Sequence, residues 1–231
     1  MSPNRVLLGM PRTVRKGLGR YRLAQLRSDL KLTPEARVLE AEEPTLEHLA
    51  AVDLATARSA PKRRIRVSEG RQPVPADRFA TKLALVCSVL NDAGAHYIVV
   101  GARALQLWGT SRFTKDTDIL IQKTLPNAER VLAGLSRIGF GVAADFTADE
   151  IVSRHVTIIG DTPRVDILTR AWNLTWQEAA PRAVTFTVEG VKVPTACIED
   201  LIASKRTSRL QDLADIEVLE AILKSRTRKS R

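Results

Sequence analysis

The sequence contains little cysteine and no long apolar run. Its two cysteines, Cys87 and Cys197, lie in apolar segments without CxxC spacing or a nearby histidine cluster, so they predict neither a zinc site nor a disulfide framework. They indicate core thiols in a reducing compartment. Nowhere do about 18 apolar residues follow one another, and the first residues hold no apolar stretch of signal-peptide length. We therefore expect a cytoplasmic protein without membrane association.

Acidic residues are scarce at both ends of the chain, which carries a formal net charge of +10. Residues 1–80 hold 16 Lys/Arg against 9 Asp/Glu, residues 81–223 hold 15 against 17, and residues 224–231 hold 5 against none. Because the middle is nearly neutral, a polyanionic partner such as RNA would be bound by the two ends. Solvated ends without a partner explain the same charge distribution.

The length of 231 residues and the hydrophobic content of 44% suit one soluble core with an appendage. Residues 1–78 are predicted to be a basic helical extension and a linker. A helix is expected to start at Thr33-Pro34, where a hydroxyl precedes a proline, and a second is expected over residues 45–60. Residues 60–78 contain three prolines and six Lys/Arg, as in a linker. Residues 79–223 form the predicted core, and residues 224–231 are a basic tail.

The core segment alternates between helical and strand-like patterns. Apolar spacing predicts helices over residues 79–94, 101–109, 126–139, 198–206 and 209–224. Short apolar or alternating runs predict strands over residues 96–100, 117–122, 154–160, 164–169, 183–188 and 191–194, the last two joined as a hairpin. The expected fold class is therefore α/β (α+β), with a small mixed β-sheet and flanking helices.

Two carboxylates begin the strand in the stretch GTSRFTKDTDILI, residues 109–121. Because side chains alternate along a strand, Asp116 and Asp118 point to the same face, with Cα atoms roughly 6 to 7 Å apart. Asp166 occupies a similar frame in RVDILT. If the two strands are neighbours, the sequence predicts that three carboxylates converge.

Three acids in one place repel one another, and a cation is their natural compensation. Carboxylate oxygens favour Mg²⁺, or Mn²⁺, which also binds substrate phosphates. A calcium loop is the competing interpretation of the DxD spacing, but such a loop continues to further acidic positions and a glycine, whereas a strand follows here. A turn with solvated acids at the start of a strand is the simpler alternative.

Two further features point to an anionic ligand. Gly101 and Ala102 lie between a predicted strand and a predicted helix, where free backbone N–H groups and the helix dipole favour a phosphate. Lys205, Arg209 and Asp212 are spaced i, i+4 and i+7, which predicts that they lie on one helical stripe, and such a stripe could be directed at a triphosphate. The alternative for the stripe is an exposed face with charge pairs at helical spacing.

These residues resemble the nucleotidyltransferases with a DNA polymerase β-like catalytic core, and among them the minimal forms and the AbiEii-like toxins. The resemblance covers residues 81–223. It rests on YIVVGARALQLWGTSRFTKDTDILI, which is similar to the family's strand, Gly-Gly or Gly-Ser, short helix, Arg-x-Thr and Asp-x-Asp, on Asp166, and on IEDLIASKRTSRLQDLADIEVL. Ala102 departs from the pattern because it has no hydroxyl to offer a phosphate, which implies a weaker hold on a nucleotide.

The resemblance implies two-metal transfer of a nucleoside monophosphate from a nucleotide triphosphate to a hydroxyl. Asp116, Asp118 and Asp166 would be the catalytic and metal-binding residues. The nucleotide would be bound by a larger set: Gly101, Ala102, Arg112, Thr114, Lys205, Arg209 and Asp212. The expected acceptor is RNA or a protein, and the expected setting is a toxin–antitoxin pair with a cognate partner. The alternative is a catalytically weak nucleotide-binding or antitoxin-type interaction module.

Overall fold

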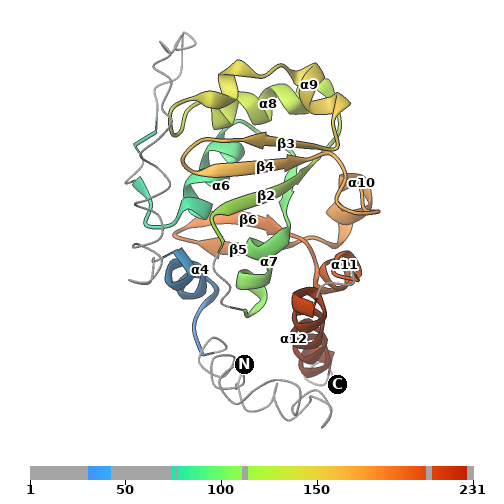
Figure 1. Cartoon of the computed structure of the whole chain (residues 1–231). Coiled ribbons are helices and arrows are strands. Elements are labelled where there is room, and N and C mark those ends of the chain that lie inside the picture. The colour runs from blue at the N-terminus through green and yellow to red at the C-terminus, as the bar shows by residue number, and fades with distance from the viewer. Residues whose placement is uncertain (1–30, 43–73, 76–77, 111–113, 207–209, 228–231) are drawn as a thin grey trace.

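The computed structural model describes residues 31–42, 74–75, 78–110, 114–206 and 210–227. Its centre is a mixed six-stranded sheet with the strand order β3-β4-β2-β1-β6-β5 (Figure 1). The strands are β1 (Tyr97–Val99), β2 (Asp116–Ile121), β3 (Val156–Ile159), β4 (Arg164–Leu168), β5 (Val184–Val188) and β6 (Val191–Thr195). The pairs β2–β4 and β1–β6 are parallel, and the other neighbouring pairs are antiparallel. The expected mixed sheet, its six strands and the β5–β6 hairpin are confirmed.

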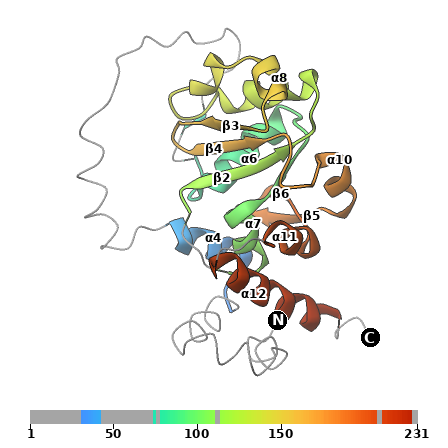
Figure 2. The same ribbon diagram turned by 45° about the vertical axis from the view of Figure 1, so that its right-hand side comes forward.

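Helices flank this sheet, as predicted. They are α4 (Pro34–Glu42), α6 (Lys82–Asp92), α7 (Gly101–Trp108), α8 (Leu125–Leu135), α9 (Ala148–Ser153), α10 (Trp176–Ala179), α11 (Ile198–Ser204) and α12 (Leu210–Thr227), with 3-10 turns η3 (Val142–Asp145) and η4 (Ala180–Arg182). The helix α6 contacts α8, while α11 and α12 contact each other and α7 (Figure 2). The helix expected over residues 45–60 lies outside the described residues.

The short helices α9 and α10 were not predicted, because six and four residues are too few to show apolar periodicity. Each begins with a capping box, in which a threonine side chain accepts from the backbone of a glutamate three residues later and that glutamate accepts from the threonine N–H. The pairs are Thr147 with Glu150 and Thr175 with Glu178. The T-x-x-E spacing is visible in the sequence and predicts such helix starts.

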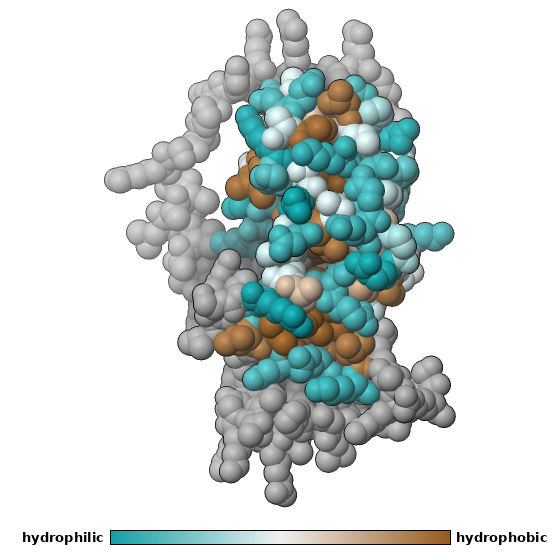
Figure 3. Space-filling model, turned by 90° about the vertical axis from the view of Figure 1, so that its right-hand side faces the viewer, coloured by the Kyte–Doolittle hydropathy of each residue, from teal (hydrophilic) through white to brown (hydrophobic). Residues whose placement is uncertain are grey.

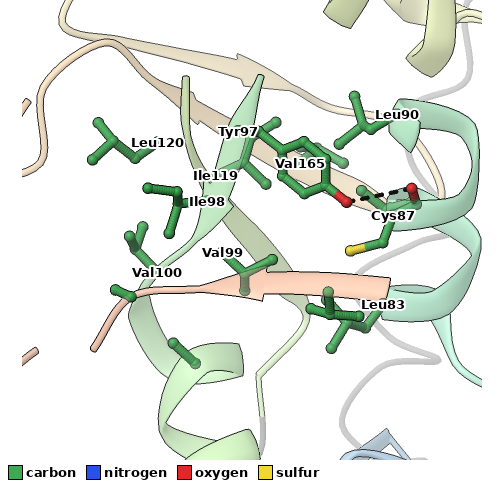
Figure 4. Packing of buried hydrophobic residues seen from close by; sticks show 14 of the residues in the cluster. Leu83, Cys87, Leu90, Tyr97, Ile98, Val99, Val100, Ile119, Leu120 and Val165 are labelled. Atoms are coloured by element: carbon green, nitrogen blue, oxygen red, sulfur yellow. Dashed lines mark hydrogen bonds between the residues drawn. The ribbon is translucent and has the colours of Figure 1, made fainter. Parts of the chain in front are cut away.

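The core lies between α6 and the strands β1 and β2 (Figure 4). Cys87 is fully buried there, and the Tyr97 hydroxyl donates a hydrogen bond to its backbone carbonyl over 3.3 Å. Burial raises the pKa of the Cys87 thiol to about 12, so the thiolate that reactive cysteines need is not formed near neutral pH. Both cysteines are buried free thiols, which confirms their prediction as core residues.

A part of the N-terminal region packs on this core. The helix α4 contacts α7 and β5, and Val38 on it is fully buried. Arg37 donates from Nη2 to the carbonyl of Leu107 over 3.1 Å, and the Glu189 N–H donates to Glu35 Oε1 over 3.1 Å. The predicted cap is present, because the Ala36 N–H donates to Thr33 Oγ1 over 3.1 Å. Residues 34–42 are therefore held by the sheet domain although they lie far from it in sequence.

The surface on the side of α10 and α11 is mostly hydrophilic in its upper part, and hydrophobic residues gather toward its lower end (Figure 3). Among the helices of the described part of the chain, none combines the length and apolar character needed to cross a bilayer.

Candidate functional site

The parallel strands β2 and β4 bring the predicted carboxylates together. Their register places the Cα atom of Asp118 opposite that of Asp166, and the Cα atom of Asp116 opposite that of Arg164. Neighbouring strands lie about 4.8 Å apart, so Asp118 and Asp166 are direct neighbours on one face of the sheet. Asp116 is two residues from Asp118 on the same strand and shares that face. The condition for the predicted convergence, that the two strands are neighbours, is therefore met.

The start of α7 lies against Asp118. The Val100 N–H donates to the backbone carbonyl of Asp118 over 3.0 Å, and α7 begins at the next residue, Gly101. Gly101 has a φ of +62°, and a Cβ atom there would overlap the Asp118 carboxylate. Only glycine satisfies both conditions, because it tolerates the left-handed region and has no side chain. Ala102 follows it in the first turn of α7 and is partly buried. Of the two predicted phosphate-binding positions, Gly101 therefore lies against the Asp118 carboxylate, and Ala102 is the next residue of the helix.

The Asp118 carboxyl is electrostatically strained. Burial, together with the negative charges of Asp166 and Asp116, raises its pKa from the ordinary value of 3.8 to about 6. The positive charges of Lys205 and Arg164 act in the opposite direction. Asp118 is therefore buried close to like charges, and cations near it compensate part of the repulsion.

Arg164 supplies part of that compensation. Its Nε lies 3.0 Å from Asp166 Oδ1 and its Nη2 donates to Asp166 Oδ2 over 3.3 Å, a two-pronged ion pair. The same Nε lies 3.4 Å from Asp116 Oδ1. Arg164 was not among the residues predicted from the sequence. The signal was present, because a residue two positions before Asp166 on a strand must share its face.

Lys205 is the second cation at the site, and one expectation about it is wrong. Lys205 and Asp212 do not lie on one helical stripe: α11 ends at Ser204, Lys205 is its C-terminal cap, and α12 begins at Leu210. The Lys205 N–H bonds to the carbonyls of Leu201 and Ile202 in the last turn, and the chain then leaves the helix. A spacing of seven residues predicts a shared face only within an unbroken helix.

The structure nevertheless brings Lys205 and Asp212 together across the two helices. Lys205 Nζ donates to Asp212 Oδ1 over 2.8 Å and lies 3.2 Å from Asp215 Oδ2. The three side chains are nearly buried, with 11%, 8% and 9% of their surfaces exposed. Asp215 was missed in the sequence analysis, although it lies three residues after Asp212 on the same helix.

Of the remaining predicted residues, the structure describes Thr114, which lies at the start of β2. Thr114 Oγ1 accepts from the Asp116 N–H over 3.3 Å and donates to the Asp116 carbonyl over 3.4 Å, so it braces the chain where the strand begins. Thr114 therefore supports the backbone of Asp116. Arg112 and Arg209 lie outside the described residues.

The donor atoms suit a hard divalent cation, since carboxylate oxygens are the ligands that Mg²⁺ and Mn²⁺ prefer. As the described side chains lie, however, no three or more His, Cys, Asp or Glu residues form a group that could hold a metal ion. Both oxygens of Asp166 face Arg164 instead. The guanidinium is a cation within ion-pair distance of two of the predicted ligands, Asp166 and Asp116.

A comparison of the chain with protein-family models finds no match, and a comparison with curated proteins finds none either.

Proposed function

We propose that this protein is a metal-dependent nucleotidyltransferase that moves a nucleoside monophosphate from a nucleotide triphosphate to a hydroxyl of an RNA or protein acceptor. The observation that carries the proposal is the register of Asp118 with Asp166 on parallel strands, directly beside the glycine at which α7 starts. The motifs that resemble the nucleotidyltransferases fall at these positions. A carboxylate cluster next to a helix N-terminus is suited to a charged phosphate substrate and its counterion.

Asp116, Asp118 and Asp166 are the residues that would hold Mg²⁺ or Mn²⁺. When bound, such an ion supplies positive charge to the phosphates and stabilises the developing negative charge of the transition state. Binding of the ion by all three carboxylates requires that Arg164 release Asp166, because the Arg164 guanidinium now bonds to both oxygens of the Asp166 carboxylate.

The reaction assigns separate tasks to the chain's own groups. The Asp166 carboxylate accepts the proton of the acceptor hydroxyl, whose oxygen attacks the α-phosphorus of the nucleotide. A phosphorus–oxygen bond forms, the bond from the α-phosphorus to the bridging oxygen breaks, and pyrophosphate leaves with that electron pair. The first backbone N–H groups of α7, at Gly101 and Ala102, bind phosphate oxygens. The positive charge of Lys205 is close enough to oppose the rise in the pKa of Asp118.

The resemblance to AbiEii-like toxins makes a toxin–antitoxin pair the setting that we propose, with a cognate partner protein. One observation favours the second candidate, a nucleotide-binding or antitoxin-type interaction module. Ala102 lacks the hydroxyl or the second glycine that the family pattern has at this position. The two candidates differ in a single property, which is transfer of the nucleotide.

The test is incubation of the protein with Mg²⁺, each α-labelled nucleotide triphosphate in turn, and total RNA or a cell lysate. Asp118→Asn and Asp166→Asn remove one proposed ligand each, and Asp145→Asn, an exposed aspartate on η3, is the matched control. We expect label transfer with the wild type and with Asp145→Asn, and a loss of at least about a hundred-fold in the other two variants.

Two results would overturn the proposal. Label transfer that persists in Asp118→Asn would show that the reaction does not need the Asp118 carboxylate. Absence of transfer with every nucleotide, together with binding of nucleotide in a filter assay, would establish the interaction module instead.

A further inference from the structure

We infer that Arg164 is the resident cation of the carboxylate cluster and that it exchanges with the divalent ion: the guanidinium must leave Asp166 and Asp116 before the ion binds. This inference rests on the proposed function, because it concerns the same carboxylates. It assigns to Arg164 a positioning role, since the side chain acts on two proposed ligands and not on the substrate.

The first support is the geometry of the ion pairs. Arg164 reaches both oxygens of Asp166, at 3.0 and 3.3 Å, and one oxygen of Asp116, at 3.4 Å. A guanidinium matches a carboxylate in this two-pronged way because its N–H groups form a rigid planar fork. Bound so, it neutralises charge and also holds Asp166 in one orientation.

The second support is the difference in exposure between the partners. The Arg164 side chain is 42% exposed, whereas that of Asp166 is 16% exposed. The carboxylate is fixed in the sheet, and the arginine can turn toward solvent without leaving a buried cavity. An ion pair of this exposure contributes little to stability, so its release costs little.

The third support is the contrast with the other cation of the site. Lys205 is nearly buried with Asp212 and Asp215, its side chain being 11% exposed. Removing a buried cation from two carboxylates is expensive, so Lys205 stays in place. Arg164 is therefore the cation of the site that can exchange.

The test measures Mn²⁺ binding to the full chain without nucleotide, through the loss of the free-ion signal in electron paramagnetic resonance. Arg164→Met removes the resident cation, and Arg164→Lys keeps a charge without the fork. Arg154→Met is the control, because Arg154 also pairs with a carboxylate at 3.4 Å, that of Glu150, on the protein surface. We expect Arg164→Met to bind Mn²⁺ about five- to ten-fold more tightly than the wild type. Arg164→Lys should fall between them, and Arg154→Met should equal the wild type.

A second measurement follows the wild type during a titration and uses a variant only to assign one resonance. The side-chain Nε resonance of Arg164, assigned by its loss in Arg164→Lys, should shift as diamagnetic Mg²⁺ is added. The dependence on salt gives a further check. At about 1 M salt, screening should reduce the difference in Mn²⁺ affinity between the wild type and Arg164→Met.

The outcomes separate the two proposals. If the wild type and Arg164→Met bind Mn²⁺ equally and the Nε resonance does not move, the exchange is wrong while the metal role of the carboxylates stands. If neither protein binds Mn²⁺, the exchange and the proposed metal-dependent function both fail. Tighter binding in Arg164→Met, with a shift in the wild type, supports both.

Discussion

At the scale of single residues, the site depends on two close contacts of Asp118. Neither contact leaves space for a larger side chain or for an uncompensated charge. Asp118 meets a second carboxylate on the neighbouring strand and the backbone of Gly101 at the start of α7. The contact between the carboxylates raises the free energy of the folded protein unless a cation neutralises it. The contact with α7 raises it unless the residue at the start of the helix is glycine. These two positions therefore give the sharpest predictions.

Asp118→Asn should stabilise the protein in a pH-dependent manner. The folded-state pKa of Asp118, about 6, is above its ordinary value of 3.8, so ionisation opposes folding. Below pH 4 the Asp118 carboxyl is neutral and the wild type has its full stability. That stability is lost as the pH rises through 6 and the carboxyl ionises. We expect the variant to be more stable than the wild type at pH 8, by up to about 3 kcal/mol, and equal to it at pH 4. Thermal unfolding followed by circular dichroism between pH 4 and 8 measures the difference.

Asp145→Asn is the control for the effect of an exposed amide, and its difference from the wild type should be small at every pH. A stabilisation by Asp118→Asn that does not change with pH would contradict the electrostatic explanation. Saturating Mg²⁺ should reverse the order at pH 8, because an ion favours the carboxylate.

Gly101→Ala should destabilise the fold more than an alanine at a comparable glycine. Both Gly101, with φ +62°, and Gly190, with φ +77°, adopt the left-handed region, but only Gly101 has atoms in the path of a Cβ. Strain alone costs roughly 1 to 2 kcal/mol, and overlap with the Asp118 carboxylate adds about as much again. Urea unfolding of Gly101→Ala and Gly190→Ala measures the two. Equal losses would show that Asp118 moves aside freely.

At the scale of the elements, the connection between α11 and α12 depends on one cation. Lys205, the cap of α11, pairs with Asp212 and Asp215 of α12. The same two helices contact α7, which carries the phosphate-binding positions that we propose. Loss of the cation should therefore loosen the helices on one side of the site.

Lys205→Met should destabilise the protein by about 3 to 5 kcal/mol, because two nearly buried carboxylates lose their shared cation. Lys224→Met is the matched control on α12: its pair with Glu220 is about half exposed and contributes only a few tenths of a kcal/mol. Chemical unfolding of both variants measures the losses. Adding Asp212→Asn to Lys205→Met should recover part of the stability, and a further loss would show that Asp212 depends on other partners.

At the scale of the whole molecule, the chain folds back so that a helix from the N-terminal region becomes part of the sheet domain. The contacts of α4 with α7 and β5 join residues 34–42 to elements that lie more than 50 residues later. Part of the region predicted as an extension thus contributes to the core. Removal of α4 should therefore lower the stability of the entire domain.

Val38→Ala tests this coupling, because Val38 is fully buried while its neighbour Leu39 is 39% exposed. We expect Val38→Ala to lower the free energy of unfolding by roughly 2 kcal/mol, and Leu39→Ala by less than about 1 kcal/mol. A single unfolding transition in both variants, seen by fluorescence and circular dichroism, would show that α4 unfolds with the core. A separate early transition in Val38→Ala would mean that α4 is an independent unit.

Local patterns in the sequence determined the strands, the longer helices and the residue types at the candidate site. Apolar periodicity predicted all six strands and the longer core helices, and the strand alternation predicted that Asp116 and Asp118 share a face, because side-chain direction in a strand is set by sequence position alone. The same rule pointed to Asp166.

The tertiary structure alone decided which elements meet. The pairing of β2 with β4, the overlap of Gly101 with Asp118, the cation shared between α11 and α12, and the docking of α4 all join residues far apart in the chain. Such contacts depend on how whole surfaces pack, and a periodic pattern describes only one element at a time. For this reason Arg164 and Asp215 gained their importance only when the strands and helices were brought together.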